Sequence, residues 1–402
     1  MRAVDPARVI ADLRELDHLT GGPEGARRVC WTGEWDAARR FLRERLARID
    51  GVEVETDEAG NLWAASPGVR EGAVAVGSHL DSVPAGGWLD GALGVMAGLE
   101  VLRTCAAEPP ERGVVLVDWA DEEGARFGRS LFGSSAVAGT LDVEEARGLR
   151  DAGGRALPEV VAEHGVKLDR ALDAQSRRAR LAAYLELHIE QGPVLEREGV
   201  SVAAVSGTFG VERRRFAFEG QASHAGTTPM ELRRDAGLAA ARAALAVERI
   251  ARDHGGVGTT GTLRLDPDIP TAVAGGAELV VDLRHAEAAA LAAMLGETGA
   301  AAEEAAAKRG CGVSDEHVWS IEPIPFDERL VAAAREASGS DRVMASGALH
   351  DAAEMARVMP AAMLFAPSTG GLSHTREEDT REEDLVQAIQ AYGRLVERIV
   401  AG

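Results

Sequence analysis

The chain has 402 residues, 46% of them hydrophobic and 27% charged, a balance that is typical of a globular protein with a sizeable core and excludes a disordered chain. Its length fits two or three domains. The formal net charge of -21 would repel nucleic acid and anionic membrane surfaces, so neither is an expected partner, whereas a small anionic substrate is compatible with local metal ions and basic side chains.

The N-terminal stretch MRAVDPARVIADLREL alternates charged and apolar residues and lacks the apolar core of a signal peptide. No apolar run in the sequence approaches the roughly 18 residues that a membrane span requires. Cys30, Cys105 and Cys311 form no CxxC pair and no disulfide-scaffold spacing, which fits a reducing compartment. We therefore expect a cytoplasmic protein.

The first half of the chain alternates helical and strand patterns, which predicts an α/β sheet with parallel segments. Functional groups in such sheets lie at the carboxyl ends of strands, and His79 and Glu122 each follow a predicted strand. The predicted elements are a helix over 34–49, strands over 52–56 and 73–77, a helix over 91–104 and a strand over 113–119.

The pattern changes twice in the second half. Residues 142–180 are charged, rich in alanine and predicted to be helical, and a strand follows over 181–188. A compact α+β unit is then predicted from a strand over 213–219, a helix over 233–253, a strand over 277–283 and a helix over 286–309. A buried strand over 361–367 and a helix over 382–400 return to the first pattern. We predict a discontinuous domain, residues 1–208 and 321–402, with an inserted domain over 209–320.

The segment GSHLDSVPAGGWLDG, residues 77–91, places His79, Asp81 and Asp90 in one glycine-rich loop after a buried strand. Imidazole and carboxylate suit a metal such as Zn, Mn or Co. In a His-x-Asp arrangement the aspartate commonly holds the second ring nitrogen and fixes the tautomer. Taken alone, the segment is equally compatible with an ordinary polar loop.

The segment DWADEEGARFG, residues 118–128, carries Glu122 and Glu123 after the next strand. One of them could ligate a metal while the other acts as general base on a water molecule. A solvated acidic turn is the alternative for this pair alone. His188, in YLELHIEQGPVLE, and His374, in STGGLSHTREED, also follow strand patterns, where a lone histidine is more often structural.

Together these loops supply a complete set of ligands for two metal ions that share one carboxylate, the arrangement used for hydrolysis. The five residues are His79, Asp90, Glu123, His188 and His374.

At this point the sequence resembles the metallopeptidase-20 superfamily, and within it the hydantoinase/carbamoylase branch. This branch comprises N-carbamoyl-L-amino acid hydrolases, allantoate amidohydrolases and β-ureidopropionases. The motifs that carry the resemblance, from about residue 60 to the C-terminal helix, are GSHLDSV, GGWLDGALGV, DEEGARF, LELHIEQGPVLE, GQASHAGTTPM, VDLRH and GGLSH.

The resemblance implies a discontinuous catalytic domain with two divalent metal ions (Zn, Mn, Co or Ni) and an inserted dimerisation or lid domain. One ion would lie on His79, Asp90 and His188, and the other on Asp90, Glu123 and His374. Glu122 would be the general base and Asp81 the partner of His79.

The resemblance also implies a homodimer and a substrate pocket. His224 would reach the site of the partner subunit and stabilise the oxyanion; a surface histidine is the alternative. Arg284 would bind the substrate carboxylate through its two-pronged guanidinium. Gln191 and Gly371 would line the pocket, and His350 would support it.

Two pocket positions depart from the family pattern. Thr271 stands where the family usually has asparagine, and Leu349 stands where it has glycine. Neither change touches an implied metal ligand, so the sequence supports the chemistry better than the substrate.

We expect hydrolysis of an N-carbamoyl-L-amino acid, with allantoate or another N-acyl or amide substrate as alternatives. A metal-free binding protein descended from such enzymes would lack ligands, whereas all five ligand positions and the base are filled.

Overall fold

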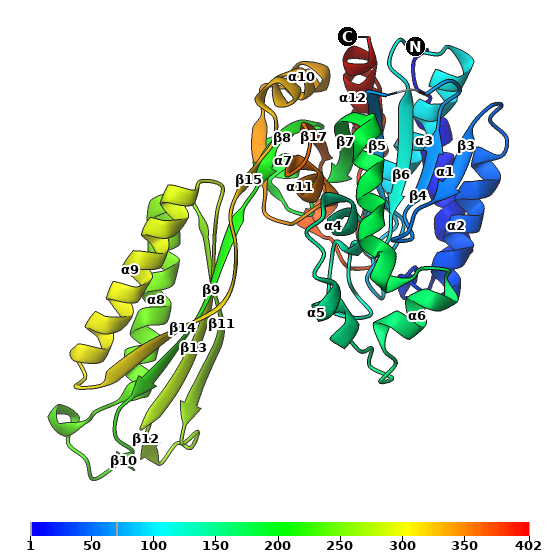
Figure 1. Cartoon of the computed structure of the whole chain (residues 1–402). Helices are drawn as coiled ribbons and strands as arrows, with labels where there is room; N and C mark the ends of the chain where they lie inside the picture. Colours follow the sequence, from blue (N-terminus) through cyan, green and yellow to red (C-terminus); the bar gives the residue numbers. More distant parts are fainter. Residues whose placement is uncertain (1, 70, 402) are drawn as a thin grey trace. The chain divides into compact units, whose positions relative to one another are not determined.

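The computed structural model describes residues 2–69 and 71–401, and these residues form two compact units. Unit 1 comprises the chain up to Gly207 and from Phe326 onward, and unit 2 comprises Thr208–Pro325. Figure 1 shows the helices and strands of both units along the chain. The described residues contain no helix suited to crossing a lipid bilayer.

Unit 1 is built on a mixed sheet with the strand order β8-β17-β7-β5-β6-β4-β3, and β16 pairs with β8. Four neighbouring strands, β17, β7, β5 and β6, run parallel, while β3, β4 and β8 are antiparallel to their neighbours. The strands are β3 (Glu53–Thr56), β4 (Leu62–Ala65), β5 (Ala73–His79), β6 (Val114–Trp119), β7 (Leu181–Ile189), β8 (Ala203–Thr208), β16 (Val343–Ser346) and β17 (Ala361–Ala366). The predicted α/β class is thus confirmed.

Alternate residues of the central strands face two separate cores, because successive side chains of a strand point to opposite faces. On one face Val74 and Val76 pack with α1, α3, α10 and α12, and on the other Ala73 and Ala75 pack with α4, α6 and α11. The helices are α1 (Pro6–Thr20), α2 (Gly33–Leu46), α3 (Ala92–Ala107), α4 (Phe132–Ala138), α7 (Val194–Glu198), α10 (Glu328–Ser338), α11 (Asp351–Ala356) and α12 (Glu382–Val400).

The segment 142–180, predicted to be helical, is broken into α5 (Val143–Gly148), α6 (Leu157–Glu163) and a 3₁₀ segment η1 (Leu168–Arg180). Gly154 and Gly165 separate these pieces with φ of 81° and 82°, in the left-handed region that glycine adopts without steric cost. The predicted helical character is thus confirmed, in three short pieces.

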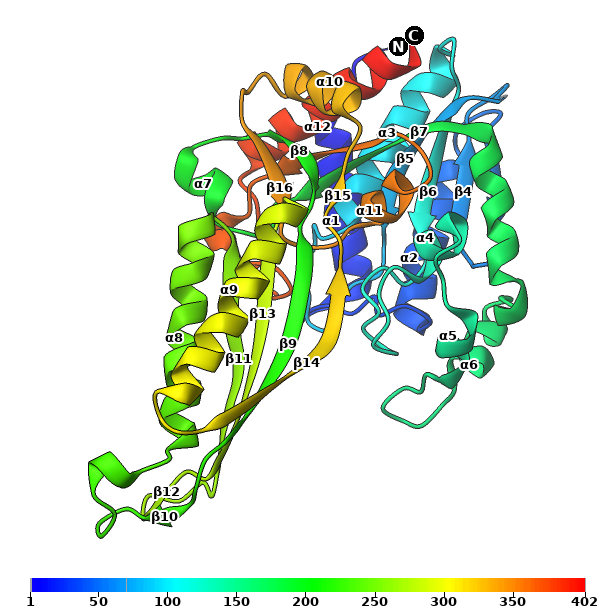
Figure 2. The ribbon, with the colours of Figure 1, turned by 60° about the vertical axis from the view of Figure 1, so that its left-hand side comes forward.

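Unit 2 is an antiparallel sheet of order β11-β13-β9-β14 with two long helices packed on one face. Figure 2 shows these helices side by side along the strands. Phe216, Phe218, Leu279 and Val281 form the buried face of the sheet. The elements are β9 (Gly210–Glu219), α8 (Ala236–His254), β11 (Val257–Asp266), β13 (Gly276–His285), α9 (Ala288–Ala307) and β14 (Gly312–Ile321), with a small ladder of β10 (Ser223–His224) and β12 (Ala272–Val273).

Candidate metal centre

Five of the predicted side chains come from one edge of the unit 1 sheet, because the parallel strands end there together. In the ladder His79, the last residue of β5, pairs with Trp119, the last of β6. His188 of β7 pairs with Phe365 of β17. The loops that follow these four strands carry the remaining acidic and histidine residues of the predicted site. The edge therefore gathers residues that are almost 300 positions apart in sequence.

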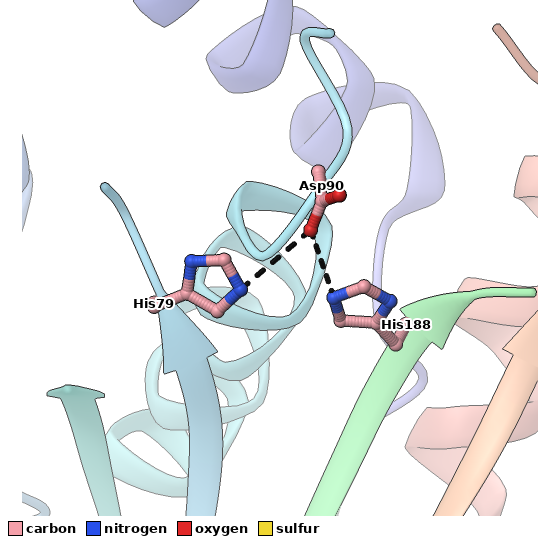
Figure 3. A group of neighbouring side chains, drawn as sticks. All are labelled: His79, Asp90 and His188. Carbon is pink, nitrogen blue, oxygen red and sulfur yellow. Dashed lines mark ion pairs between the residues drawn. The ribbon is translucent and has the colours of Figure 1, made fainter. Parts of the chain in front are cut away.

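Asp90 lies between the two buried histidines, and one of its oxygens faces both rings (Figure 3). Its Oδ1 is 3.6 Å from Nε2 of His79 and 3.1 Å from Nε2 of His188. The three ligand atoms lie within 4.8 Å of one another, which is close enough to surround one cation.

The other oxygen of Asp90 belongs to a second cluster. Oδ2 is 3.4 Å from Nε2 of His374, and the same nitrogen is 3.4 Å from Oε2 of Glu123. Asp90, Glu123 and His374 again offer three ligand atoms within 4.8 Å of one another. The structure therefore brings all five predicted ligand residues together, with Asp90 common to both groups.

Both buried histidines present the correct nitrogen to a cation. Nδ1 of His79 is 3.1 Å from the carbonyl oxygen of Asp81, and Nδ1 of His188 is 2.9 Å from that of Ile189. A carbonyl oxygen only accepts hydrogen bonds, so each Nδ1 carries a proton. In a neutral ring such as that of His79, this leaves the lone pair on Nε2, the atom that faces Asp90. In His188 the effect of burial is outweighed by the hydrogen bond to Asp90, which raises the pKa to about 9, so Nε2 carries a second proton that a cation would displace.

The acidic groups of the site are buried close together, and this raises the pKa of several of them. Burial, followed by the charge of Asp351, raises the pKa of Glu122 well above its usual value. Burial and the charge of Asp90 raise the pKa of Glu123 to about 8. Burial lowers the pKa of His79 to about 4, so this ring is neutral. Such a cluster of carboxylates and neutral imidazole is suited to a divalent cation, which would relieve the repulsion.

Asp90 itself behaves differently from its acidic neighbours. Burial alone would raise its pKa, but hydrogen bonds from His188 and His374 bring it well below the usual value. The hydrogen bond to Asp90 in turn raises the pKa of His374 to about 9. Protons on the histidines thus occupy the place where cations would balance the charge of Asp90.

Several buried side-chain atoms have no hydrogen-bond partner among the described residues, and one of them belongs to a predicted ligand. Oε1 of Glu123 is inaccessible to solvent and accepts no hydrogen bond from any described residue. An unpaired buried carboxylate oxygen is costly unless something binds it. The residues present therefore fit a cation beside Glu123.

Glu122 lies next to the first group of ligands. Its Oε2 is 3.7 Å from Nε2 of His79, and the residue is only 7% exposed. This places a second carboxylate at the edge of the site without making it part of either group of three ligand atoms. The position is suitable for a group that handles a proton.

The carboxylate of Asp81 contacts the backbone of Glu122 and Glu123 more closely than it contacts the ring of His79. Its carboxylate oxygens accept hydrogen bonds from the backbone N–H groups of Glu122 and Glu123, at 3.3 and 3.1 Å. Its Oδ1 is 3.7 Å from Nδ1 of His79, which instead contacts the Asp81 carbonyl oxygen. Asp81 therefore links the histidine loop to the glutamate loop through both its side chain and its backbone.

Four residues of unit 1 were predicted to line or support the substrate pocket. Nε2 of Gln191 donates to Oδ2 of Asp90 at 2.8 Å. Gly371 has φ of 67°, and a Cβ there would lie 2.7 Å from the ring of Pro193, so only glycine fits. Leu349 is half-buried. Its neighbour His350 lies on the ring of His188, with centroids 4.5 Å apart.

Glu186 was not among the predicted residues, although it is fully buried behind the ligands. It forms a third possible ligand group with His188 and His350. Its oxygens accept hydrogen bonds from Ser78 Oγ at 2.6 Å and from the N–H of Ala352 at 3.0 Å. A charged residue inside the apolar strand pattern LELH is the signal that could have revealed it.

The remaining predicted residues belong to unit 2. Nδ1 of His224 accepts hydrogen bonds from the N–H groups of Gly226 and Thr227, at 3.0 and 3.2 Å, so the neutral ring carries its proton on Nε2. Thr271 immediately precedes β12, and its carbonyl oxygen accepts a hydrogen bond from the N–H of Ala225 at 2.9 Å.

Arg284 lies at the other end of the unit 2 sheet from this ladder. It pairs with Val211 near the start of β9, and its Nε donates to Asp282 at 2.7 Å. The β10–β12 ladder adjoins Gly276, where β13 begins. Eight residues of extended strand at about 3.3 Å each separate the two ends by roughly 26 Å.

The sequence and the structure of this chain are both similar to those of one group of known hydrolases. The family model of Peptidase family M20/M25/M40 matches residues 75–398. The N-carbamoyl-L-amino acid amidohydrolase of Geobacillus stearothermophilus is 37% identical over 97% of this chain and 97% of its own. The allantoate amidohydrolase of Bacillus subtilis is 31% identical over 93% of each. A crystal structure of an amidase of the hydantoinase/carbamoylase family from Burkholderia multivorans has a TM-score of 0.91 and 32% identity, covering 100% of this chain and 99% of that one.

Proposed function

The chain belongs to peptidase family M20/M25/M40, as its motifs predict, and from this premise we propose that it hydrolyses N-carbamoyl-L-amino acids. It is an amidohydrolase of small ureido compounds, to judge from full-length relatives named for that activity. The observation that supports hydrolysis by two metal ions is Asp90, whose two oxygens face two separate sets of ligands, and the substrate class is supported by full-length relatives named for it. Purified protein incubated with a series of N-carbamoyl-L-amino acids should release ammonia and the free amino acid.

The proposed site holds two divalent ions, Zn, Mn, Co or Ni, one on each set of ligands. When bound, these ions would supply Lewis-acid activation of the scissile carbonyl and of a water molecule. Glu122 would take a proton from the attacking water and deliver it to the leaving nitrogen. With a carbamoyl substrate the products balance as an amino acid, ammonia and carbon dioxide.

Removal of metal should abolish the activity reversibly. After dialysis against a chelator we expect turnover to fall to background, and addition of Mn²⁺ or Zn²⁺ to metal-free protein should restore it. Metal content measured by mass spectrometry should approach two equivalents per chain in the restored protein. Full activity in protein that holds less than a tenth of an equivalent would contradict the proposal.

We propose that unit 1 is the catalytic domain and that unit 2 is the dimerisation or lid domain of a homodimer. His224 carries its ring proton on Nε2, so it could donate a hydrogen bond to the carbonyl oxygen as charge develops there. His224 lies in the ladder near the start of β13 and Arg284 near its end, so we propose that the two residues of one chain serve different sites. A homodimer in which His224 acts in the partner subunit's site satisfies this requirement.

Arg284 is the proposed holder of the substrate carboxylate. A guanidinium binds a carboxylate through two parallel hydrogen bonds, which the ammonium of lysine does not reproduce. We expect Arg284→Lys to raise KM about 10- to 100-fold, the cost of losing one charged hydrogen bond. Steady-state kinetics would measure this, and an unchanged KM would assign the residue another role. The melting temperature should change little, because the side chain is partly exposed.

Allantoate is the second candidate substrate, because a relative of 31% identity over 93% of the chain is named for it. Allantoate has a second ureido group, so its turnover would require room that a carbamoyl amino acid does not need. The ratio of kcat/KM for the two substrates decides between them, and turnover of neither would point to another N-acyl or amide substrate.

We also propose the cytoplasm as the compartment. Cys30, Cys105 and Cys311 form no disulfide bond in the structure, and the first two are buried. A reducing environment keeps cysteines in the thiol form.

A further inference from the structure

Glu378 joins the loop that carries Asp90 to the loop that carries His374. The residue is only 2% exposed. Its Oε1 accepts hydrogen bonds from the backbone N–H groups of Leu89 and Asp90, at 3.1 and 3.0 Å. A carboxylate four positions after His374 thus holds the backbone of the shared ligand Asp90 in place.

The Asp90 loop is shaped to admit this carboxylate. A Cβ at Gly87 would lie 2.1 Å from Oε1 of Glu378 and 2.4 Å from its Cβ. Contacts this short are impossible, so any side chain at position 87 would displace Glu378. Glycine at this position therefore has a packing reason that is specific to Glu378.

Ser373 connects Glu378 to the side chain of Asp90. Its Oγ is 2.9 Å from Oε2 of Glu378 and 3.1 Å from Oδ2 of Asp90. A hydroxyl has one proton, so it can donate to only one of these two carboxylates at a time. The choice matters, because Oδ2 of Asp90 is the oxygen that faces His374 in the second ligand group.

We propose that Glu378 is a positioning residue that accepts the proton of Ser373 and thereby keeps a second hydrogen-bond donor, beside Gln191, away from Asp90 Oδ2, so that a lone pair of this oxygen stays available to a cation. The proposal rests on the proposed function, since it concerns the second cation of that site. Glu378 acts through Ser373 and through the Asp90 backbone, and it contacts none of the reacting atoms. Mutation of a residue that supports a metal ligand in this way typically lowers metal affinity by about 10- to 100-fold.

The variant Glu378→Gln separates this role from a purely structural one. The side-chain oxygen of glutamine can still accept the two backbone hydrogen bonds. Its amide nitrogen would then face Ser373 Oγ and donate to it, so the proton of Ser373 would turn toward Asp90 Oδ2. We expect E378Q to bind the second metal ion about 10- to 100-fold more weakly than the wild type while the metal-free protein keeps its melting temperature.

Ser373→Ala provides the second arm of the test. If the proton of Ser373 points to Glu378 in the wild type, S373A should keep metal affinity within about threefold, because Asp90 loses no donor that opposes a cation. The double variant E378Q/S373A should recover most of the affinity that E378Q loses. Asp327→Asn is the matched control, since Asp327 also accepts two backbone hydrogen bonds through one oxygen, at the start of α10. It should leave metal affinity unchanged.

The measurement is calorimetric titration of Mn²⁺, and separately Zn²⁺, into metal-free protein for the wild type and the four variants, with melting temperatures recorded in parallel. Wild-type affinity in E378Q overturns the proposal. A double variant as weak as E378Q overturns the role of Ser373, and tighter binding by S373A of tenfold or more shows that its proton lies on Asp90. Those results would leave the proposed function intact, whereas a wild-type protein that binds neither ion and turns over no ureido substrate would overturn both.

Discussion

Replacement of Glu122 by glutamine should remove nearly all turnover while the protein retains its metal. The change keeps the size of the side chain and removes its ability to take a proton. General base catalysis is typically worth about 10²- to 10⁴-fold, so we expect a fall in kcat of this order. Glu122 contributes no atom to either group of three ligand atoms, and metal content should therefore stay at the wild-type level.

The neighbouring residue supplies the control for this experiment. Glu123→Gln makes the same chemical change one position along, at a side chain that belongs to the second ligand group. It should lower metal content as well as activity, and excess Mn²⁺ should restore part of the activity. Excess metal should not rescue E122Q. A kcat for E122Q within about tenfold of the wild type would remove Glu122 from the role of base.

Mixed dimers should recover activity that neither parent variant shows. His224→Ala lacks the proposed donor to the partner subunit, and Asp90→Asn lacks the shared metal ligand. In a mixed dimer the intact metal site of the first subunit would receive His224 from the second. If the subunits exchange at random, about a quarter of all sites are complete, so roughly a quarter of wild-type activity is expected.

The same experiment includes its own internal comparison. A double variant that carries both changes on one chain, mixed with wild-type protein, contains mixed dimers whose sites each lack one component. Its activity should reflect only the wild-type dimers that remain. If mixtures of the single variants stay inactive although mass spectrometry shows that mixed dimers have formed, each subunit acts alone and the shared-site proposal is wrong.

The α/β class and the family could be predicted because their signals are local. Apolar runs such as AVAVG mark buried strands, and the polar residues that follow them mark the functional edge of the sheet. The family assignment from motifs was confirmed by relatives that cover the whole chain. His79 and Glu122 are examples of residues whose position relative to a strand could be read directly from the sequence.

Other features depend on contacts between distant segments and could not be predicted. Glu378 lies in the run TREED, which looks like a solvated acidic turn, yet it is buried against the backbone of Asp90. The strand β11 was missed because its sequence, VGTTGTLRLD, has no apolar alternation, as befits an exposed edge strand. The break within 142–180 required knowing that Gly154 and Gly165 adopt left-handed backbone conformations.

The way in which the chain enters and leaves unit 2 has a consequence for engineering. Val211, just after the entry, pairs with Ile321, just before the exit, so the two passages of the chain are adjacent strands. A segment with neighbouring ends and its own apolar core can be excised or transplanted as a module. Unit 2 could thus be exchanged between relatives at two adjacent chain crossings. Such an exchange would transfer His224, Thr271 and Arg284 together to another host, whereas the proposed metal ligands would remain behind.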